Sequence, residues 1–299
     1  MSTDRAFHFD VIVAPPDLTV PGTRLVGFSE RSGARFSHQL MPRPSLGIAV
    51  DCTQGSLTAT GGSARASALV GGMTPRSVVS GATFECLEIQ LSPLLARALL
   101  DVHPAELGRP LVALDDIWGA DAERLRNRII DAASWAERFD LVHAMLTKRL
   151  ARHSDATHRP DPVAGDAWRR IVRSGGHLPI GTLPGQYGVG RTQFWKRFRE
   201  EVGLSPKQAA RIVRFDRALR LLGAGAGLAE VAAEAGYSDQ PHLNREFADL
   251  AGLSPGGLSP GGLRNHPSWR SRVTLHRTSG HADPPIGIPR ASSLSPAHS

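Results

Sequence analysis

The chain has 299 residues, of which 41% are hydrophobic and 21% charged, so it can bury a globular core and is long enough for two folded units. Its net charge is +7, and the excess of basic residues lies after residue 150: residues 1–150 carry 15 Lys and Arg against 16 Asp and Glu, residues 151–263 carry 15 against 11, and residues 264–299 carry 5 against 1. These numbers exclude a fibrous protein, and the uneven charge indicates that the second half meets a polyanion.

Residues 1–91 are predicted to form short β-strands separated by turns. The expected strands, each bounded by Gly, Pro, Ser or Asp, are Phe9–Val13, Arg24–Phe28, Leu46–Val50, Ser56–Thr60, Ala68–Val70 and Phe84–Leu91. Many short strands joined by glycine-rich turns are typical of a sandwich or a barrel. No segment approaches the ~20 consecutive apolar residues of a membrane-spanning helix.

Three helices are predicted to follow these strands. Ser92 and Pro93 are residue types preferred at the start of a helix. A second helix is expected over residues 121–133, and Ser134 with Glu137 forms the pattern of a capping box that opens a third. We therefore predict an α+β protein whose first domain, residues 1–151, is a β-rich, cupin-like sandwich or barrel closed by a helical hairpin.

The rest of the chain divides into a linker, a helical domain and a tail. Residues 152–163 are polar and contain Pro, which is typical of a linker. Residues 164–263 have a helical pattern throughout, beginning with a helix from Asp166 to Ser174. Residues 264–299 are rich in Pro and Ser without periodicity, so we expect a disordered tail.

Within the helical domain, a short helix, a tight glycine turn and a longer helix occur twice. The first set is Thr182–Tyr187, the turn at Gly188–Gly190, and Arg191–Glu201. A connecting helix begins at the capping box of Ser205 and Gln208. The second set is Leu228–Glu234, the turn at Ala235–Tyr237, and a final helix capped by Ser238 or Asp239. A helix that follows a tight turn in this way is the element that enters the DNA major groove.

The outward faces of the two longer helices carry residue types that bind DNA. Gln and Asn can form two hydrogen bonds to adenine, Arg can do so to guanine, and Lys or Arg neutralises phosphate. The predicted DNA-binding residues are Arg191, Thr192, Trp195, Lys196 and Arg199 in the first helix, and Gln240, Pro241, His242, Asn244 and Arg245 in the second. Between residues 191 and 220 there are nine basic and three acidic residues, an excess that favours contact with phosphates.

Several of these residues also have structural interpretations. Trp195 can pack between helices, and His242 can face solvent or bind the backbone. The arginines of the connecting helix can form a solvated face, pair with acids across helices or contact phosphate; they are Arg211, Arg214, Arg217 and Arg220.

Residues 183–206 and 228–255 resemble the tandem helix-turn-helix domain of the AraC/XylS transcription regulators. The run GYSDQPHLNREF, followed by AGLSP, matches the family signature nearly position for position. Gly190, Pro184 and Gly227 depart from the residues usual in the family. The resemblance implies that the two recognition helices contact DNA, and the first domain is similar, more weakly, to the β-rich sensing domains of many members.

The favoured prediction is a cytoplasmic, sequence-specific transcription regulator and not an enzyme. Its expected partners are double-stranded DNA, a small-molecule effector in the first domain, a second copy in a homodimer and, if it activates, RNA polymerase, with no membrane. We predict no catalytic residue, cofactor or metal ligand, since Cys52 and Cys86 form no metal-binding pattern and no hydrolase, P-loop, zinc-protease or dinucleotide motif occurs. The alternative is an enzyme or carrier with a β-barrel active domain that the basic domain tethers to nucleic acid; convergent titratable groups in its pocket would favour it.

Overall fold

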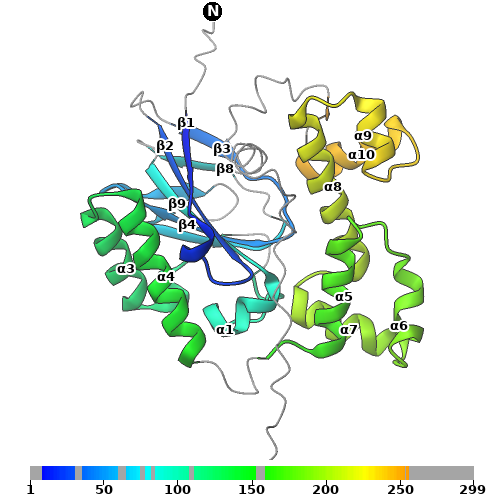
Figure 1. Cartoon of the computed structure of the whole chain (residues 1–299), viewed down its shortest axis with the longest axis horizontal. Helices are drawn as coiled ribbons and strands as arrows, with labels where there is room; N and C mark the ends of the chain where they lie inside the picture. Colours follow the sequence, from blue (N-terminus) through cyan, green and yellow to red (C-terminus); the bar gives the residue numbers. More distant parts are fainter. Residues whose placement is uncertain are drawn as a thin grey trace, which may run out of the picture.

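The computed structural model describes residues 9–30, 36–59, 65–74, 78–81, 85–107, 111–152, 159–252 and 254–255. The predicted tail, residues 264–299, and residues 153–158 of the predicted linker lie outside the described residues. The described chain forms a β-rich domain and a helical domain that lie side by side (Figure 1). This arrangement confirms the predicted α+β fold class.

The β-rich domain is a sandwich of two antiparallel sheets. The larger sheet has the strand order β1 (Phe9–Val13), β2 (Thr23–Glu30), β9 (Glu85–Leu91), β4 (Leu46–Asp51), β7 (Ala68–Gly71) and β10 (Val112–Ala113). The smaller sheet has the order β3 (Phe36–Gln39), β8 (Val78–Gly81), β5 (Leu57–Ala59) and β6 (Arg65–Ala66). Buried side chains of both sheets form the core between them, including Phe28 and Leu69 from the larger and Leu57 from the smaller.

The predicted strands correspond to β1, β2, β4, β5, β7 and β9, whereas β3, β6, β8 and β10 were not predicted. The missed strands are short, and β6 and β10 contain two residues each. A strand of this length shows no alternation of polar and apolar residues in the sequence. It is defined by its neighbour instead, as when Val112 and Ala113 pair with Val70 and Leu69 of β7.

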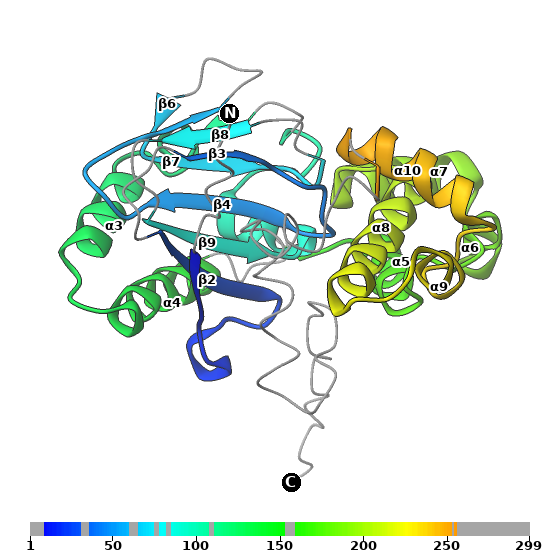
Figure 2. The same ribbon diagram turned by 90° about the horizontal axis from the view of Figure 1, so that it is seen from above.

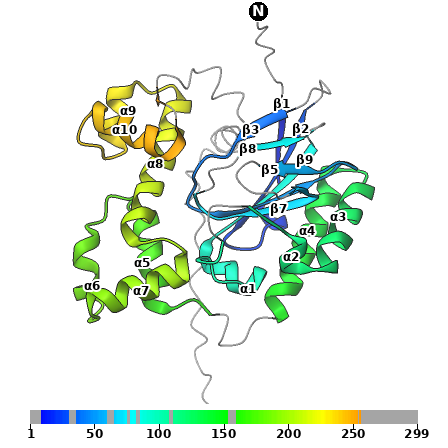
Figure 3. The same ribbon diagram turned by 180° about the vertical axis from the view of Figure 1, so that it is seen from behind.

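Four helices cover the β-rich domain: α1 (Ala96–Leu100), α2 (Asp115–Trp118), α3 (Ala120–Asp131) and α4 (Trp135–Arg152). The Ser134 hydroxyl caps α4 by accepting from the Glu137 N–H at 3.2 Å, as predicted. The Glu137 carboxylate, however, accepts from the N–H of Ala133, one residue earlier than in a standard capping box. Two opposite views place α3 and α4 on the side of the sandwich away from the helical domain (Figures 1 and 3).

The helical domain contains α5 (Pro162–Arg173), α6 (Leu183–Gln186), α7 (Arg191–Val202), α8 (Pro206–Ala224), α9 (Leu228–Glu234) and α10 (Gln240–Ala251). Helix α5 starts at Pro162 and not at the predicted Asp166, because the Asp161 carboxylate accepts from the Ala164 N–H and Pro is tolerated in the first turn. Since α4 also extends to Arg152, helices occupy both ends of the predicted linker 152–163.

The two halves of the helical domain are held by different cores. Helices α5 and α7 contribute Trp168, Phe194 and Phe198 to one apolar cluster that continues into the β-rich domain. Helices α9 and α10 contribute to a separate cluster around Phe215 and Phe247. Helix α8 belongs to both, so it joins the two halves.

Candidate nucleic-acid interface

Two helix-turn-helix units can now be defined: the first is α6, its turn and α7, and the second is α9, its turn and α10. The turns contain Gly188, with φ of 63°, and Gly236, with φ of 77°. Glycine adopts this left-handed conformation without the steric penalty of a side chain. At Gly236 there is also no room, because a Cβ atom would overlap the imidazole ring of His177.

Helix α7 is positioned by its buried aromatic face and by a polar network at the preceding turn. Phe194 and Phe198 are fully buried, and the Phe194 ring stacks on Tyr187 with 6.0 Å between centroids. The Tyr187 hydroxyl donates to Asp166 at 2.6 Å and accepts from Arg170 at 3.2 Å. Partial burial raises the pKa of Tyr187, with the Asp166 hydrogen bond as the second cause.

Helix α10 is positioned by an aromatic pair and by a buried acid. Phe247 packs against Phe215 of α8 with 4.7 Å between ring centroids. Glu246 is 5% exposed and pairs with Arg211 (3.0 Å) and Arg214 (3.6 Å) of α8. The helix begins as predicted, with the Asp239 carboxylate accepting from the His242 N–H at 2.6 Å.

In α7, the structure exposes most of the predicted DNA-binding residues. Arg191, Thr192 and Lys196 are exposed. Trp195 is half-buried, with the Arg191 guanidinium 5.5 Å from the centre of its ring. Arg199 is exposed near the C-terminal end of α7, but it also lines a cavity between the domains.

In α10, Gln240, Pro241 and Arg245 are exposed and Asn244 is half-buried. His242 is tied to its own turn instead: its Nδ1 accepts from the Ser238 N–H at 3.4 Å. Its ring also lies edge-on to Tyr237 with 5.3 Å between centroids. The geometry of His242 therefore fits the structural interpretation left open by the sequence.

Several basic residues of α7 and α8 have acidic partners inside the protein. Arg211 pairs with Glu246 and, at 2.5 Å, with Asp249, while Arg220 pairs with Asp216 at 2.9 Å. Arg197 of α7 pairs with Asp161 at 2.7 Å. These pairs account for part of the basic excess predicted to contact phosphates, because their charge is already neutralised within the fold.

The two recognition helices lie on one side of the connecting helix. Figure 2, seen from above, places α7 and α10 on the same side of α8, and Figure 1 separates them along its length. An arrangement of this kind allows two helices to enter successive major grooves on one face of a duplex, roughly 34 Å apart.

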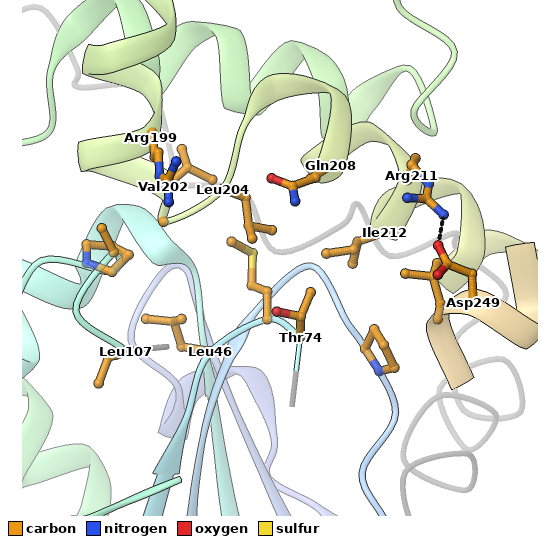
Figure 4. A pocket seen from close by; sticks show the side chains of 16 residues that line it. Leu46, Thr74, Leu107, Arg199, Val202, Leu204, Gln208, Arg211, Ile212 and Asp249 are labelled. Atoms are coloured by element: carbon orange, nitrogen blue, oxygen red, sulfur yellow. Dashed lines mark hydrogen bonds and ion pairs between the residues drawn. The ribbon is translucent and has the colours of Figure 1, made fainter. Parts of the chain in front are cut away.

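A cavity of about 410 Å³ lies between the two domains (Figure 4). The β-rich domain lines it with apolar side chains that include Leu46, Met73 and Leu107. The helical domain contributes Arg199, near the end of α7, to the lining. It also contributes Arg211 of α8 and Asp249 of α10, which form an ion pair with each other at the cavity surface. Among the described residues, no three His, Cys, Asp or Glu side chains are grouped to bind a metal.

Sequence reasoning missed two residues of the β-rich domain that contact the second helix-turn-helix unit. The Gln39 side chain donates to the carbonyl oxygen of Ala251, the last residue of α10, at 2.6 Å. Met41 is 3% exposed and belongs to the apolar cluster of α8, α9 and α10. No local pattern could have indicated these contacts, since Gln39 and Ala251 are 212 residues apart.

Part of the helical domain is similar to a known family of domains. A family model described as a helix-turn-helix domain matches residues 185–259. No curated protein matches the chain by sequence. In the part of the chain that the structure describes, no helix combines the length and hydropathy needed to cross a membrane.

Solved structures that are similar to the chain include ToxT from Vibrio cholerae, with 12% identity and a TM-score of 0.44, covering 78% of this chain and 95% of that one. The C-terminal domain of AraT, a response regulator from Geobacillus stearothermophilus, has 21% identity and a TM-score of 0.31. The match covers 41% of this chain and 96% of that domain. The AraC-like transcriptional activator CuxR has 15% identity and a TM-score of 0.33. The match covers 76% of this chain and 86% of CuxR.

The matched residues run from α6 to just beyond α10, so they include both glycine turns and both recognition helices. The resemblance to the AraC/XylS regulators is thereby confirmed for this part of the chain. Residues 185–259 are an AraC-type helix-turn-helix domain that binds DNA, and the protein is a transcription regulator, not an enzyme.

Proposed function

We propose that this regulator reads two successive major grooves, with α7 in one and α10 in the other. In α10, Gln240, Asn244 and Arg245 contact base edges, while Pro241 fits against the duplex and His242 holds the turn. In α7, Thr192 and Trp195 lie against the bases or the sugar edge, and Arg191 and Lys196 contact phosphate. Arg199, at the cavity, contributes least to this surface.

One observation carries this proposal: most of the proposed DNA-contacting residues of α7 and α10 are exposed, while arginines of α8 are paired with acids inside the protein. Arg245 is exposed, whereas Glu246, the next residue, is buried against Arg211 and Arg214. Among the described residues, Arg245 forms no ion pair. An arginine held outward on a rigid helix is therefore available to a guanine edge.

Replacing Arg245 with Ala tests the proposal. We expect one base position of the binding site to lose its preference, with a cost of about 1–3 kcal/mol in binding and little change in folding stability. The measurement is the sequence preference of the full-length chain, selected from random double-stranded DNA. Arg124→Ala, an exposed arginine of α3 on the far side of the sandwich, is the matched control. An unchanged preference in Arg245→Ala would contradict the assignment.

We also propose that a small-molecule effector acts through the β-rich domain at the cavity between the domains. The cavity is large enough for a small ligand, and its walls come from both domains, so a ligand there can favour one arrangement over another. Filling it with Met73→Trp should abolish any change in DNA affinity caused by a cellular small-molecule extract. A response that survives in Met73→Trp would place the effector elsewhere.

A cytoplasmic location follows from the same function, because the protein must reach DNA. Dimerisation and, for an activator, contact with RNA polymerase stay predictions.

A further inference from the structure

A short segment after β3 bridges the β-rich domain and the second helix-turn-helix unit. We call residues 39–42 the strap. Gln39 donates to the carbonyl oxygen of Ala251 at 2.6 Å, which satisfies one of the acceptors left open at the end of a helix. Met41 is buried in the cluster that contains Phe215 and Phe247. The strap therefore contacts the C-terminal end of α10 by a hydrogen bond and places one buried side chain in the apolar cluster that α8, α9 and α10 share.

Successive side chains of the strap belong to different cores. Leu40 packs against the cluster between the two sheets, whereas Met41 is part of the cluster of the second helix-turn-helix unit. Pro42 lines the cavity between the domains. A shift of the strap relative to the sandwich would move side chains in the second unit directly.

The first helix-turn-helix unit is attached differently. Its core is continuous with that of the β-rich domain, and α7 packs against the 3₁₀ helix Pro93–Leu95. At the end of α7, a Cβ atom on Gly203 would lie 2.7 Å from the carbonyl oxygen of Pro104, so the two backbones are in close contact. By contrast, Met41 is the one buried residue before Phe215 in the second cluster, among the residues that the structure describes.

We propose that Gln39 and Met41 are positioning residues for the second recognition helix, through which the β-rich domain sets how α10 enters its groove. Gln39 holds the C-terminal end of α10, and Met41 lies in the apolar cluster that α10 shares with α8 and α9. The helix has 12 residues, so it is about 18 Å long, and a tilt of about 10° about its C-terminal end moves Gln240 at the other end by about 3 Å and Asn244 and Arg245, near the middle, by about half as much. That displacement exceeds the tolerance of a hydrogen bond.

This inference rests on the proposed function, so its test is made on the DNA site that the wild-type full-length chain selects. The bases read by α10 are first identified as those whose preference Arg245→Ala relaxes. Gln39→Ala and Met41→Ala should then lower affinity by about tenfold, with the lost preference confined to those bases and the bases read by α7 unchanged. Gln39→Ala leaves the apolar core intact, so it remains informative even if Met41→Ala unfolds the second unit.

Two variants separate positioning from a general loss of stability. Met41→Leu keeps the buried volume and should retain the wild-type preference. Met145→Ala makes the same side-chain truncation in α4, away from the helical domain, and should leave the preference of both halves unchanged. An even loss over both halves in Gln39→Ala, or no loss at all, would overturn the inference. A wild-type chain that selects no sequence would instead refute the proposed function.

Discussion

Phe247→Ala is expected to lower the free energy of unfolding by about 3–5 kcal/mol and to abolish recognition by α10. The Phe247 side chain is fully buried and packs on Phe215, so its removal loses transfer free energy and leaves a cavity between α10 and α8. The apolar packing of α10 depends strongly on this ring, because the second cluster is small and separate from the main core; the other attachments of α10 are polar, from Glu246 and Gln39. Hydrogen exchange of the α10 amides and DNA affinity measure the two consequences.

Two controls accompany this prediction. Phe247→Leu retains most of the apolar volume and should cost less than about 1.5 kcal/mol, with DNA binding preserved. Phe139→Ala removes an equally buried ring from α4 in the β-rich domain, so it should destabilise the chain without loosening α10 selectively. If α10 exchanges no faster in Phe247→Ala than in Phe139→Ala, the aromatic pair does not position the helix.

Local signals predicted the helical domain well. At α8, the Ser205 hydroxyl accepts from the Gln208 N–H at 3.3 Å and the Gln208 side chain accepts from the Ser205 N–H at 3.2 Å, as the capping box indicated. The turns at Gly188 and Gly236 also follow from sequence, since both need a positive φ. Caps, glycine turns and apolar spacing act over a few residues, so the sequence alone contains the information.

Contacts between distant segments could not be predicted in the same way. The strands β6 and β10 have two residues each and are too short to show a pattern, and the strap meets α10 across more than half of the chain. The start of α5 was missed for a different reason: Pro162 appeared to belong to a polar linker, whereas Asp161 in front of it caps the helix. A proline after a capping residue begins a helix more often than it interrupts one.

The charges of α8 show the same limit of sequence reasoning. Helical spacing indicates which side of α8 carries Arg211 and Arg214, but not which element covers that side. The structure places α10 there and brings Glu246 against both arginines. Arg245 and Glu246 are adjacent in sequence, but Arg245 is exposed and Glu246 is buried. Arg245 is therefore available to contact DNA, whereas Glu246 stabilises the packing of α10 on α8.

Glu246→Ala is therefore expected to destabilise the second helix-turn-helix unit by about 2–3 kcal/mol, because it leaves two arginines facing a buried site without their acid. The value is below that of a fully buried pair, since the Arg211 and Arg214 side chains are 36% and 22% exposed and Arg211 keeps Asp249. Burial and the charge of Glu246 raise the pKa of Tyr237, so loss of the acid should also lower that pKa.

Denaturant unfolding of the full-length chain measures the loss in Glu246→Ala, and Glu246→Gln isolates charge from shape. The glutamine keeps a side-chain oxygen that can accept from the Arg211 Nε–H, so it should retain part of the stability but not the charge pairing. Arg245→Ala is the matched neighbour, and its stability should stay near that of the wild type while its base preference changes. Equal destabilisation by Arg245→Ala and Glu246→Ala would show that the two side chains are not divided between DNA and the fold.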